Sequence, residues 1–306
     1  MNFSVKKTIK LLLSNMSTAA GFIISIFFII LAVCYVIFGN RIVPYNPQQM
    51  NLFATNLSPS LNHLFGTDNL GRDIFSRVLA GIPIDIGISL FIVLVSALVG
   101  LFLGIIAGYF RGIIEEVIMR VTDIFLAFPA LLMSMMIAAT IGPSLLYASL
   151  SLIFVWWPPY VRLVRGNTLQ VTALDFITMS KILNTPFRKI LLKGILPNIT
   201  TTLLIYATLD IGSAILDLST MGYLGIGIPV NSPELGMMAS IMSVNFYTYP
   251  LEGLIPAFFI FILVMGFSLM GEGLTQLIDP NIRTHLISRK QRVKELEKIK
   301  VVPAPS

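Results

Sequence analysis

Apolar residues run through this chain in long blocks that short polar stretches separate. A helix needs about 20 apolar residues to cross a hydrocarbon core, and four blocks meet this length: 21–39, 86–109, 121–141 and 253–277. Two further blocks, 145–164 and 199–222, are less uniform, because the first ends in Trp156 to Pro159 and the second carries two aspartates. The pattern predicts an all-α integral membrane protein with about six transmembrane helices.

Composition supports this class, since 56% of the residues are hydrophobic, 12% are charged and the mean hydropathy is +0.86. The first block has 19 residues, is not followed by a small-residue cleavage site and precedes further blocks, so we interpret it as a membrane anchor rather than a cleaved signal peptide. The single cysteine, Cys34, lies inside this block and leaves no partner for an intrachain disulfide.

Lysine and arginine predict the orientation, because short loops rich in them stay in the cytoplasm. In chain order, they gather before the first block, between the second and third, from the end of the fourth to the fifth, and after the sixth; only Arg41, Arg72 and Arg77 of the 21 fall outside these segments. We therefore expect a multi-pass protein of the cell membrane with both termini cytoplasmic. The positive charge is spread over four segments rather than one patch, which argues against nucleic-acid binding.

The basic segment between the fourth and fifth blocks has helical signals of its own. Thr185 followed by Pro186 predicts a helix start, and an apolar stripe follows at Phe187, Ile190, Leu191 and Gly194. A second short helix over 175–183 would join it at Asn184, a residue that tolerates a left-handed backbone. Such a helix pair either lies on anionic headgroups or docks a cytoplasmic protein.

Three motifs carry a resemblance to a known family. The spacing from Asn184 to Pro197, with its ending ILPN, resembles the cytoplasmic "EAA" loop of permease subunits of ATP-binding-cassette importers. FGTDNLGRDIFSRVLAG at 65–81 and YLGIGIPVNSPELGMM at 223–238 are similar to the peptide and nickel branch, and in particular to the C-type subunits of dipeptide and oligopeptide permeases. The likeness covers about residues 60–280, with the fine pattern changed where Thr178, Met179 and Ser180 replace Glu-Ala-Ala and Asn184 replaces glycine.

The resemblance implies a type I importer permease fold and a division of the chain. Residues 1–83 would hold the cytoplasmic start, the first transmembrane helix and an external segment; 84–280 would form the core, with a coupling loop at 166–198; 281–306 would be a basic cytoplasmic tail. The residues that the resemblance assigns to ATPase docking are Thr178, Met179, Ser180, Leu183, Asn184, Thr185, Pro186, Phe187 and Arg188.

The resemblance also implies partners. These are a second, homologous permease in a heterodimer, two ATPase subunits that bind ATP and Mg²⁺, and an external solute-binding protein. The chain itself carries no GxxxxGK[ST] motif and no paired Cys/His spacing, so we expect no enzyme activity, no cofactor and no metal in it. Its two histidines, His63 and His285, are predicted on opposite sides of the membrane.

Two segments are predicted on the external side. Asp68, Arg72 and Asp73 stand close together in the first, where Asp73 and Arg77 would pair at i, i+4 on a helix; they form either an exposed structural turn or a contact for the binding protein. Gly225 and Gly227 suit a tight loop over the mouth of a pathway, since no strand and no basic residue accompanies them as a phosphate loop would require.

Asp210 and Asp217 lie seven residues apart in the fifth block and share one helix face, about 10 Å apart. Ionisable residues rarely face lipid, so each either accepts hydrogen bonds from a neighbouring helix or lines the translocation pathway. For Asp210, near mid-span, we hypothesise a pathway wall that attracts a cationic group such as a peptide amino terminus.

The sequence thus favours an importer permease for di- or oligopeptides, with nickel or metal chelates and oligosaccharides as alternative substrates. A secondary transporter is less well supported, because such proteins usually carry internal repeats. A membrane enzyme would need a cluster of His, Cys or carboxylates that the sequence does not show.

Overall fold

The computed structural model describes residues 16–243 and 247–278, and this part of the chain is helical with one isolated β-bridge, between Thr67 and Asp73. The expected basic tail at 281–306 and residues 1–15, which precede the first described helix, lie outside the described residues. The helices are α2 (Met16–Phe38), η1 (Gly39–Arg41), α3 (Ile74–Phe110), α4 (Gly112–Leu126), α5 (Ala130–Ile141), α6 (Leu145–Thr172), α7 (Asp175–Ile182), α8 (Phe187–Ile190), η2 (Leu191–Ile195), α9 (Leu196–Tyr223), α10 (Leu235–Ser243) and α11 (Pro250–Ile278).

The all-α membrane class is confirmed. Four stretches are long and apolar enough to cross a membrane, namely Met16–Arg41, Ile74–Phe110, Phe187–Tyr223 and Pro250–Thr275. α6 has the length of a span but is not among them, in keeping with the two tryptophans and two prolines at its middle. The expected single span over 121–141 is wrong, because α4 and α5 meet there at 83°. Pro129 explains the break, since the residue before a proline avoids the helical conformation.

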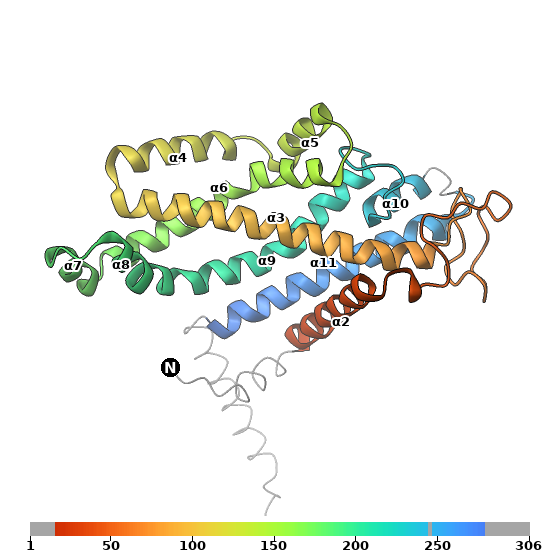
Figure 1. The fold of residues 1–306 in the computed structure, drawn as a ribbon, viewed down its shortest axis with the longest axis horizontal. Coiled ribbons are helices and arrows are strands. Elements are labelled where there is room, and N and C mark those ends of the chain that lie inside the picture. The colour runs from red at the N-terminus through yellow and green to blue at the C-terminus, as the bar shows by residue number, and fades with distance from the viewer. Residues whose placement is uncertain (1–15, 244–246, 279–306) are drawn as a thin grey trace, which may run out of the picture.

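The bundle is organised around α3 and α6, which run side by side (Figure 1). α9 packs against α3 and α11, and α2 lies on the outside against α11 and α3. Three apolar clusters fill the space along this bundle: one contains Ile82 and Phe267, the second contains Tyr160 and Ile195, and the third contains Leu152.

The helix α3 is longer than its apolar block. It begins at Ile74, where the Asp73 side chain caps it by accepting a hydrogen bond from the Ser76 N–H. At 37 residues it is about 55 Å long, well beyond a hydrocarbon core of about 30 Å. The boundary that we expected between residues 83 and 84 therefore falls inside a continuous helix, which accommodates Pro83.

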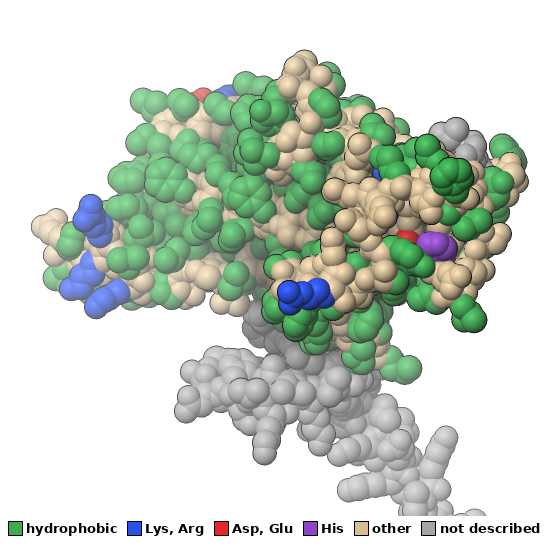
Figure 2. Space-filling view, turned by 45° about the vertical axis from the view of Figure 1, so that its right-hand side comes forward, with side chains coloured by type: hydrophobic (Ala, Val, Ile, Leu, Met, Phe, Trp, Pro, Cys, Tyr) green, Lys and Arg blue, Asp and Glu red, His purple; other side chains and the backbone are tan. Residues whose placement is uncertain are grey.

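The short elements lie at the two ends of the long helices. α7 and α8 stand at one end, while α10 and the irregular segment 42–73 stand at the other (Figure 1). Figure 2 shows apolar side chains over most of the face between them, with several Lys and Arg side chains at the α7–α8 end and one more near the lower middle of the view. The basic side chains exposed on the α7–α8 segment are Lys181, Arg188, Lys189 and Lys193.

Candidate functional site

The turn between α7 and α8 has the geometry that the sequence predicts. Asn184 adopts a φ of +51°, in the left-handed region that asparagine tolerates. The Leu183 N–H donates to the Met179 carbonyl and the Thr185 N–H donates to the Ser180 carbonyl, each at 3.0 Å. These bonds close the end of α7 and send the chain back toward the bundle.

This helix pair has a buried side and an exposed side. Ile177 and Ile190 are almost fully buried, and a side chain at Gly194 would collide with the Ile177 terminal methyl. On the other side Met179 is 61% exposed and Leu183 is 78% exposed. Of the residues predicted to dock an ATPase, Thr178, Met179, Leu183, Asn184, Pro186 and Arg188 are exposed, and Ser180, Thr185 and Phe187 are half-buried.

The predicted start of the second helix is wrong by one residue. Pro186, not Thr185, occupies the N-cap position, with an extended backbone and no side-chain cap. α8 is also not a separate helix, because it continues through the π turn η2 into α9 as one stretch, Phe187–Tyr223. The π turn lets the Leu196 N–H reach the Leu191 carbonyl, just before Pro197, which has no N–H to give.

Aromatic and charged contacts that we did not predict support the α7–α8 segment. The Phe187 and Tyr109 rings lie 4.6 Å apart between centroids, and the Lys181 ammonium lies 4.7 Å from the centre of the Tyr109 ring. Beside them, Arg165 on α6 donates through Nε to Glu115 on α4 at 2.6 Å. The segment is thus held against the ends of α3 and α6, and α6 is joined to α4 beside it.

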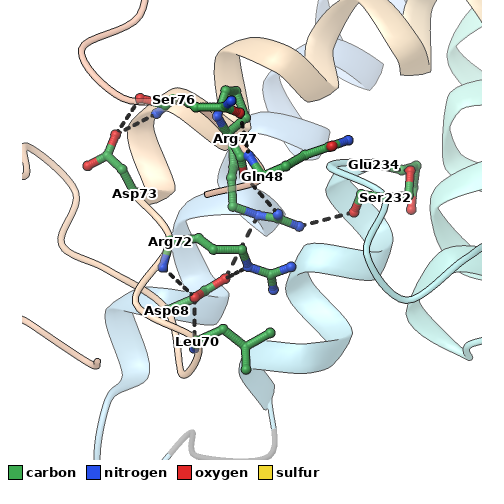
Figure 3. A network of polar contacts seen from close by, with 11 residues as sticks. Gln48, Asp68, Leu70, Arg72, Asp73, Ser76, Arg77, Ser232 and Glu234 are labelled. Atoms are coloured by element: carbon green, nitrogen blue, oxygen red, sulfur yellow. Dashed lines mark hydrogen bonds and ion pairs between the residues drawn. The ribbon is translucent and has the colours of Figure 1, made fainter. Parts of the chain in front are cut away.

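At the opposite end, the charged residues of the 65–81 motif form a buried network (Figure 3). Asp68 accepts hydrogen bonds from the Leu70 and Arg72 N–H groups, both at 2.9 Å, and from the Arg72 Nε at 2.6 Å. Arg77 donates to the carbonyls of Pro47 and Ser232, each at 3.1 Å. The network joins segment 42–73 to the loop that leads into α10.

This arrangement corrects two expectations. Asp68, Arg72 and Asp73 are at most 3% exposed, so they form neither an exposed turn nor a surface for direct contact with another protein. Asp73 does not pair with Arg77: its carboxylate caps α3 and lies 2.9 Å from the His63 Nδ1. The i, i+4 spacing failed because Asp73 precedes the first helical turn instead of lying within it.

The glycine-rich loop is tight, as expected. Gly225 and Gly227 have φ values of +70° and +74°, which only glycine adopts without strain. The Gly227 carbonyl accepts a hydrogen bond from the Ser144 N–H at 2.9 Å, and a side chain at Gly227 would meet the Ala138 methyl at 2.8 Å. The loop therefore closes over the junction of α5 and α6.

Two buried carboxyl groups beside this loop were not predicted. Glu234 caps α10 by accepting hydrogen bonds from the Gly236 and Met237 N–H groups at 2.9 and 2.6 Å. Asp85, on α3, accepts a long hydrogen bond of 3.4 Å from the Leu235 N–H, and its other oxygen has no partner among the described residues. Both side chains are fully buried. Burial raises the pKa of Glu234 above the ordinary range, although its two N–H donors act in the opposite direction.

We expect this site to make stability depend on pH. A carboxyl group with a raised pKa keeps a proton in the folded protein that the unfolded chain releases, so stability falls as pH rises from the ordinary carboxyl range toward the raised pKa. Glu234→Gln removes that titration. The thermal unfolding midpoint of the purified protein should fall by a few degrees more in the wild type than in Glu234→Gln between pH 5 and pH 8; parallel curves for the two proteins would contradict this assignment.

The two carboxylates of α9 lie among aromatic side chains of α6. The Trp156 Nε1 donates to Asp217 at 3.2 Å, so the hydrogen bond from a neighbouring helix that we considered for Asp217 is present. The Asp210 carboxylate lies next to the hydroxyl groups of Tyr160 and Tyr206.

Close packing of α3 on α6 depends on a motif that we overlooked. Gly100, Gly104 and Gly108 recur every four residues on α3, and a Cβ at any of them would collide with Tyr160, Val164 or Thr168 of α6, respectively. Small residues at this spacing allow two helices to approach closely in a membrane. The pattern was visible in the sequence, but the sequence did not show which helix would face it.

The family match and the relatives found by comparison with known proteins all indicate a membrane transport component. Residues 100–284 match the family described as binding-protein-dependent transport system inner membrane components. The chain is 37% identical over 257 residues to a glutathione transport system permease protein, GsiD, of Shigella flexneri serotype 5b, covering 84% of this chain and 85% of that protein. GsiD of Shigella boydii serotype 4 is 35% identical with the same coverage.

Solved structures share the fold. One is an amino acid ABC transporter, with a TM-score of 0.51 and 15% identity, covering 65% of this chain and 92% of that one. Another is the inward-facing MetNI methionine ABC transporter, with a TM-score of 0.54 and 16% identity, covering 66% and 97%. At these identities the likeness concerns the backbone arrangement alone.

Proposed function

Because this chain belongs to the family of binding-protein-dependent transport system inner membrane components, we propose that it forms half of the translocation pathway of an importer for di- or oligopeptides. It is a permease subunit of an ATP-binding-cassette importer and not an enzyme, since ATP hydrolysis in such systems belongs to separate subunits. The relatives are named for glutathione, itself a short peptide, and this supports a peptide-like substrate.

The observation that carries the proposal is the exposed surface of α7 and its C-terminal turn, which we call the docking surface: Thr178, Met179, Leu183 and Asn184. Apolar side chains such as Met179 and Leu183 are left uncovered at the basic end of the molecule, where a protein partner would bury them. We assign this surface to an ATPase subunit that binds ATP and Mg²⁺. A homologous permease, a second ATPase and an external solute-binding protein would complete the importer.

The fold suggests how movement reaches the membrane. α8, η2 and α9 form one helical stretch, Phe187–Tyr223, which carries Asp210 and Asp217. When the ATPases close on ATP, a displacement of the docking surface would pass along this stretch into the pathway wall without a flexible joint. The transition between inward-open and outward-open states is then a rigid-body rearrangement.

Cysteine labelling in intact cells tests the orientation that this function requires. In a Cys34→Ala background, an impermeant thiol reagent should label Asn231→Cys, which is exposed on the loop before α10, and spare Ser180→Cys on α7. The same protein should copurify with ATPase subunits and support ATP-dependent uptake of a tripeptide in proteoliposomes containing the binding protein. Labelling of Ser180→Cys alone, or uptake without ATP, would refute the proposed function.

A further inference from the structure

Both acidic residues of helix α9 lie on one polar stripe, although the helix also carries Asn198, Thr200, Thr201, Thr208 and Ser219 outside it. At 100° per residue the members of the stripe fall within an arc of about 80°, and they follow one another at intervals of three or four residues: Thr202, Tyr206, Asp210, Ser213, Asp217 and Thr220. Thr202 and Ser213 are exposed and the other four are half-buried. Polar and ionisable residues inside a membrane rarely face lipid, and they mark water-filled cavities or protein contacts.

Helix α6 flanks the two carboxylates of this stripe with aromatic rings. Trp156 donates its Nε1–H to Asp217. One turn further along α6, the Tyr160 ring packs edge-on against Tyr206, with 5.4 Å between ring centroids. Each carboxylate therefore lies beside a polar atom of an aromatic side chain, the Trp156 Nε1–H at Asp217 and the Tyr160 and Tyr206 hydroxyl groups at Asp210.

The Tyr160 hydroxyl group, beside Asp210, has incomplete hydrogen bonding. Tyr160 is fully buried, and its hydroxyl interacts with the Asp210 carboxylate beside it but forms no well-aligned hydrogen bond with any described residue. None of the ion pairs found within residues 16–243 and 247–278 involves Asp210 or Asp217. Two acidic groups in a membrane span thus lack a cation in the part of the chain that the structure describes.

Resting on the proposed importer function, we propose that Asp210 and Asp217 form two successive binding sites for a cationic organic group of the transported substrate, such as a primary ammonium. A carboxylate without a cationic partner suits a primary ammonium, which can donate charge-assisted hydrogen bonds to it. The two carboxylates are about 10 Å apart along the helix, too far to hold one metal ion together. Each carboxylate offers a separate, weak site, and weak sites allow a transported cation to move on rather than stay bound.

Modification of a cysteine at Ser213, between the two carboxylates, tests the proposal without knowledge of the natural substrate. In the complete importer with Cys34→Ala, we expect a trimethylammonium methanethiosulfonate to modify Ser213→Cys about tenfold faster than the sulfonate analogue, after correction for their rates with a free thiol, because a site lined by one sign of charge concentrates the opposite ion. Adding Asp210→Asn should reduce this preference several-fold. Leu204→Cys, on the opposite face of α9, should react with neither reagent.

The possible outcomes separate the inference from the proposed function. Equal rates for the two reagents would overturn the cation sites while leaving a hydrated pathway. Protection of Ser213→Cys from both reagents would overturn the pathway itself. Protection of Ser213→Cys by Ni²⁺ but not by n-butylammonium would overturn the choice of an organic cation. Asp210→Glu, which retains the charge, should keep the preference; its loss in this variant would show that shape, and not charge, governs the site.

Discussion

Leu183→Asp is expected to abolish ATP-dependent uptake while the permease remains folded in the membrane. Leu183 is 78% exposed at the C-terminal end of α7, so a charge there costs the isolated chain little. In a complex the same charge would be buried against the ATPase without a partner. The loss of an apolar contact at the centre of an interface costs about 2–4 kcal/mol, which corresponds to a 30-fold to 1000-fold weaker association.

Copurification of the ATPases with the permease measures this effect directly. Leu183→Met, which keeps the apolar surface, serves as the control and should retain both ATPase and uptake. Thermal unfolding should be the same for all three proteins. Full ATPase retention by Leu183→Asp would show that the docking surface lies elsewhere.

Gly100→Val is expected to prevent stable folding of the bundle. A Cβ at Gly100 would come within 3 Å of the Tyr160 backbone, and backbone atoms cannot turn aside as the end of a side chain can. Overpacking of this kind typically costs about 1–3 kcal/mol, and a β-branched side chain adds further atoms to the collision. We expect the amount of folded protein extracted from membranes to fall severely, with a thermal midpoint lowered by about 5 °C or more in any protein that remains.

Gly87 provides the matched control on the same helix. It is exposed, and a Cβ there would meet no atom within 4 Å, so Gly87→Val should change neither yield nor thermal midpoint. Gly100→Ala should give an intermediate loss. Equal behaviour of Gly87→Val and Gly100→Val would mean that α3 and α6 do not pack closely at this point.

Structural features that depend only on residues near one another in the sequence were predicted well. Five of the six predicted spans are single helices in the structure, and four of these are long and apolar enough to cross a membrane, because hydrophobic length is a property of each segment alone. The turn at Asn184 was predicted for a similar reason, since its left-handed backbone follows from the local chemistry of asparagine. The glycine-rich loop at Gly225 and Gly227 belongs to the same class.

Predictions that required a partner from elsewhere in the chain were weaker. Asp73 was expected to pair with Arg77, but its carboxylate instead binds the Ser76 N–H and the His63 ring. Arg77 donates to the carbonyl of Ser232, 155 residues away. The carboxyl pair of Asp85 and Glu234 was not predicted, because nothing in either local sequence indicates that α3 and the loop before α10 meet.

The sequence by itself determined that this protein is a helical membrane permease, because length, apolarity, basic-residue placement and three short motifs each act within one segment. Only the tertiary structure decided which side chains share a site. It buried the charged 65–81 motif, joined α8 to α9 in one helical stretch, and placed Tyr160 and Trp156 beside the two aspartates of α9. The physical reason is that the environment of a buried polar group is set by the helices packed around it, and helix packing depends on contacts between residues that are far apart in the chain.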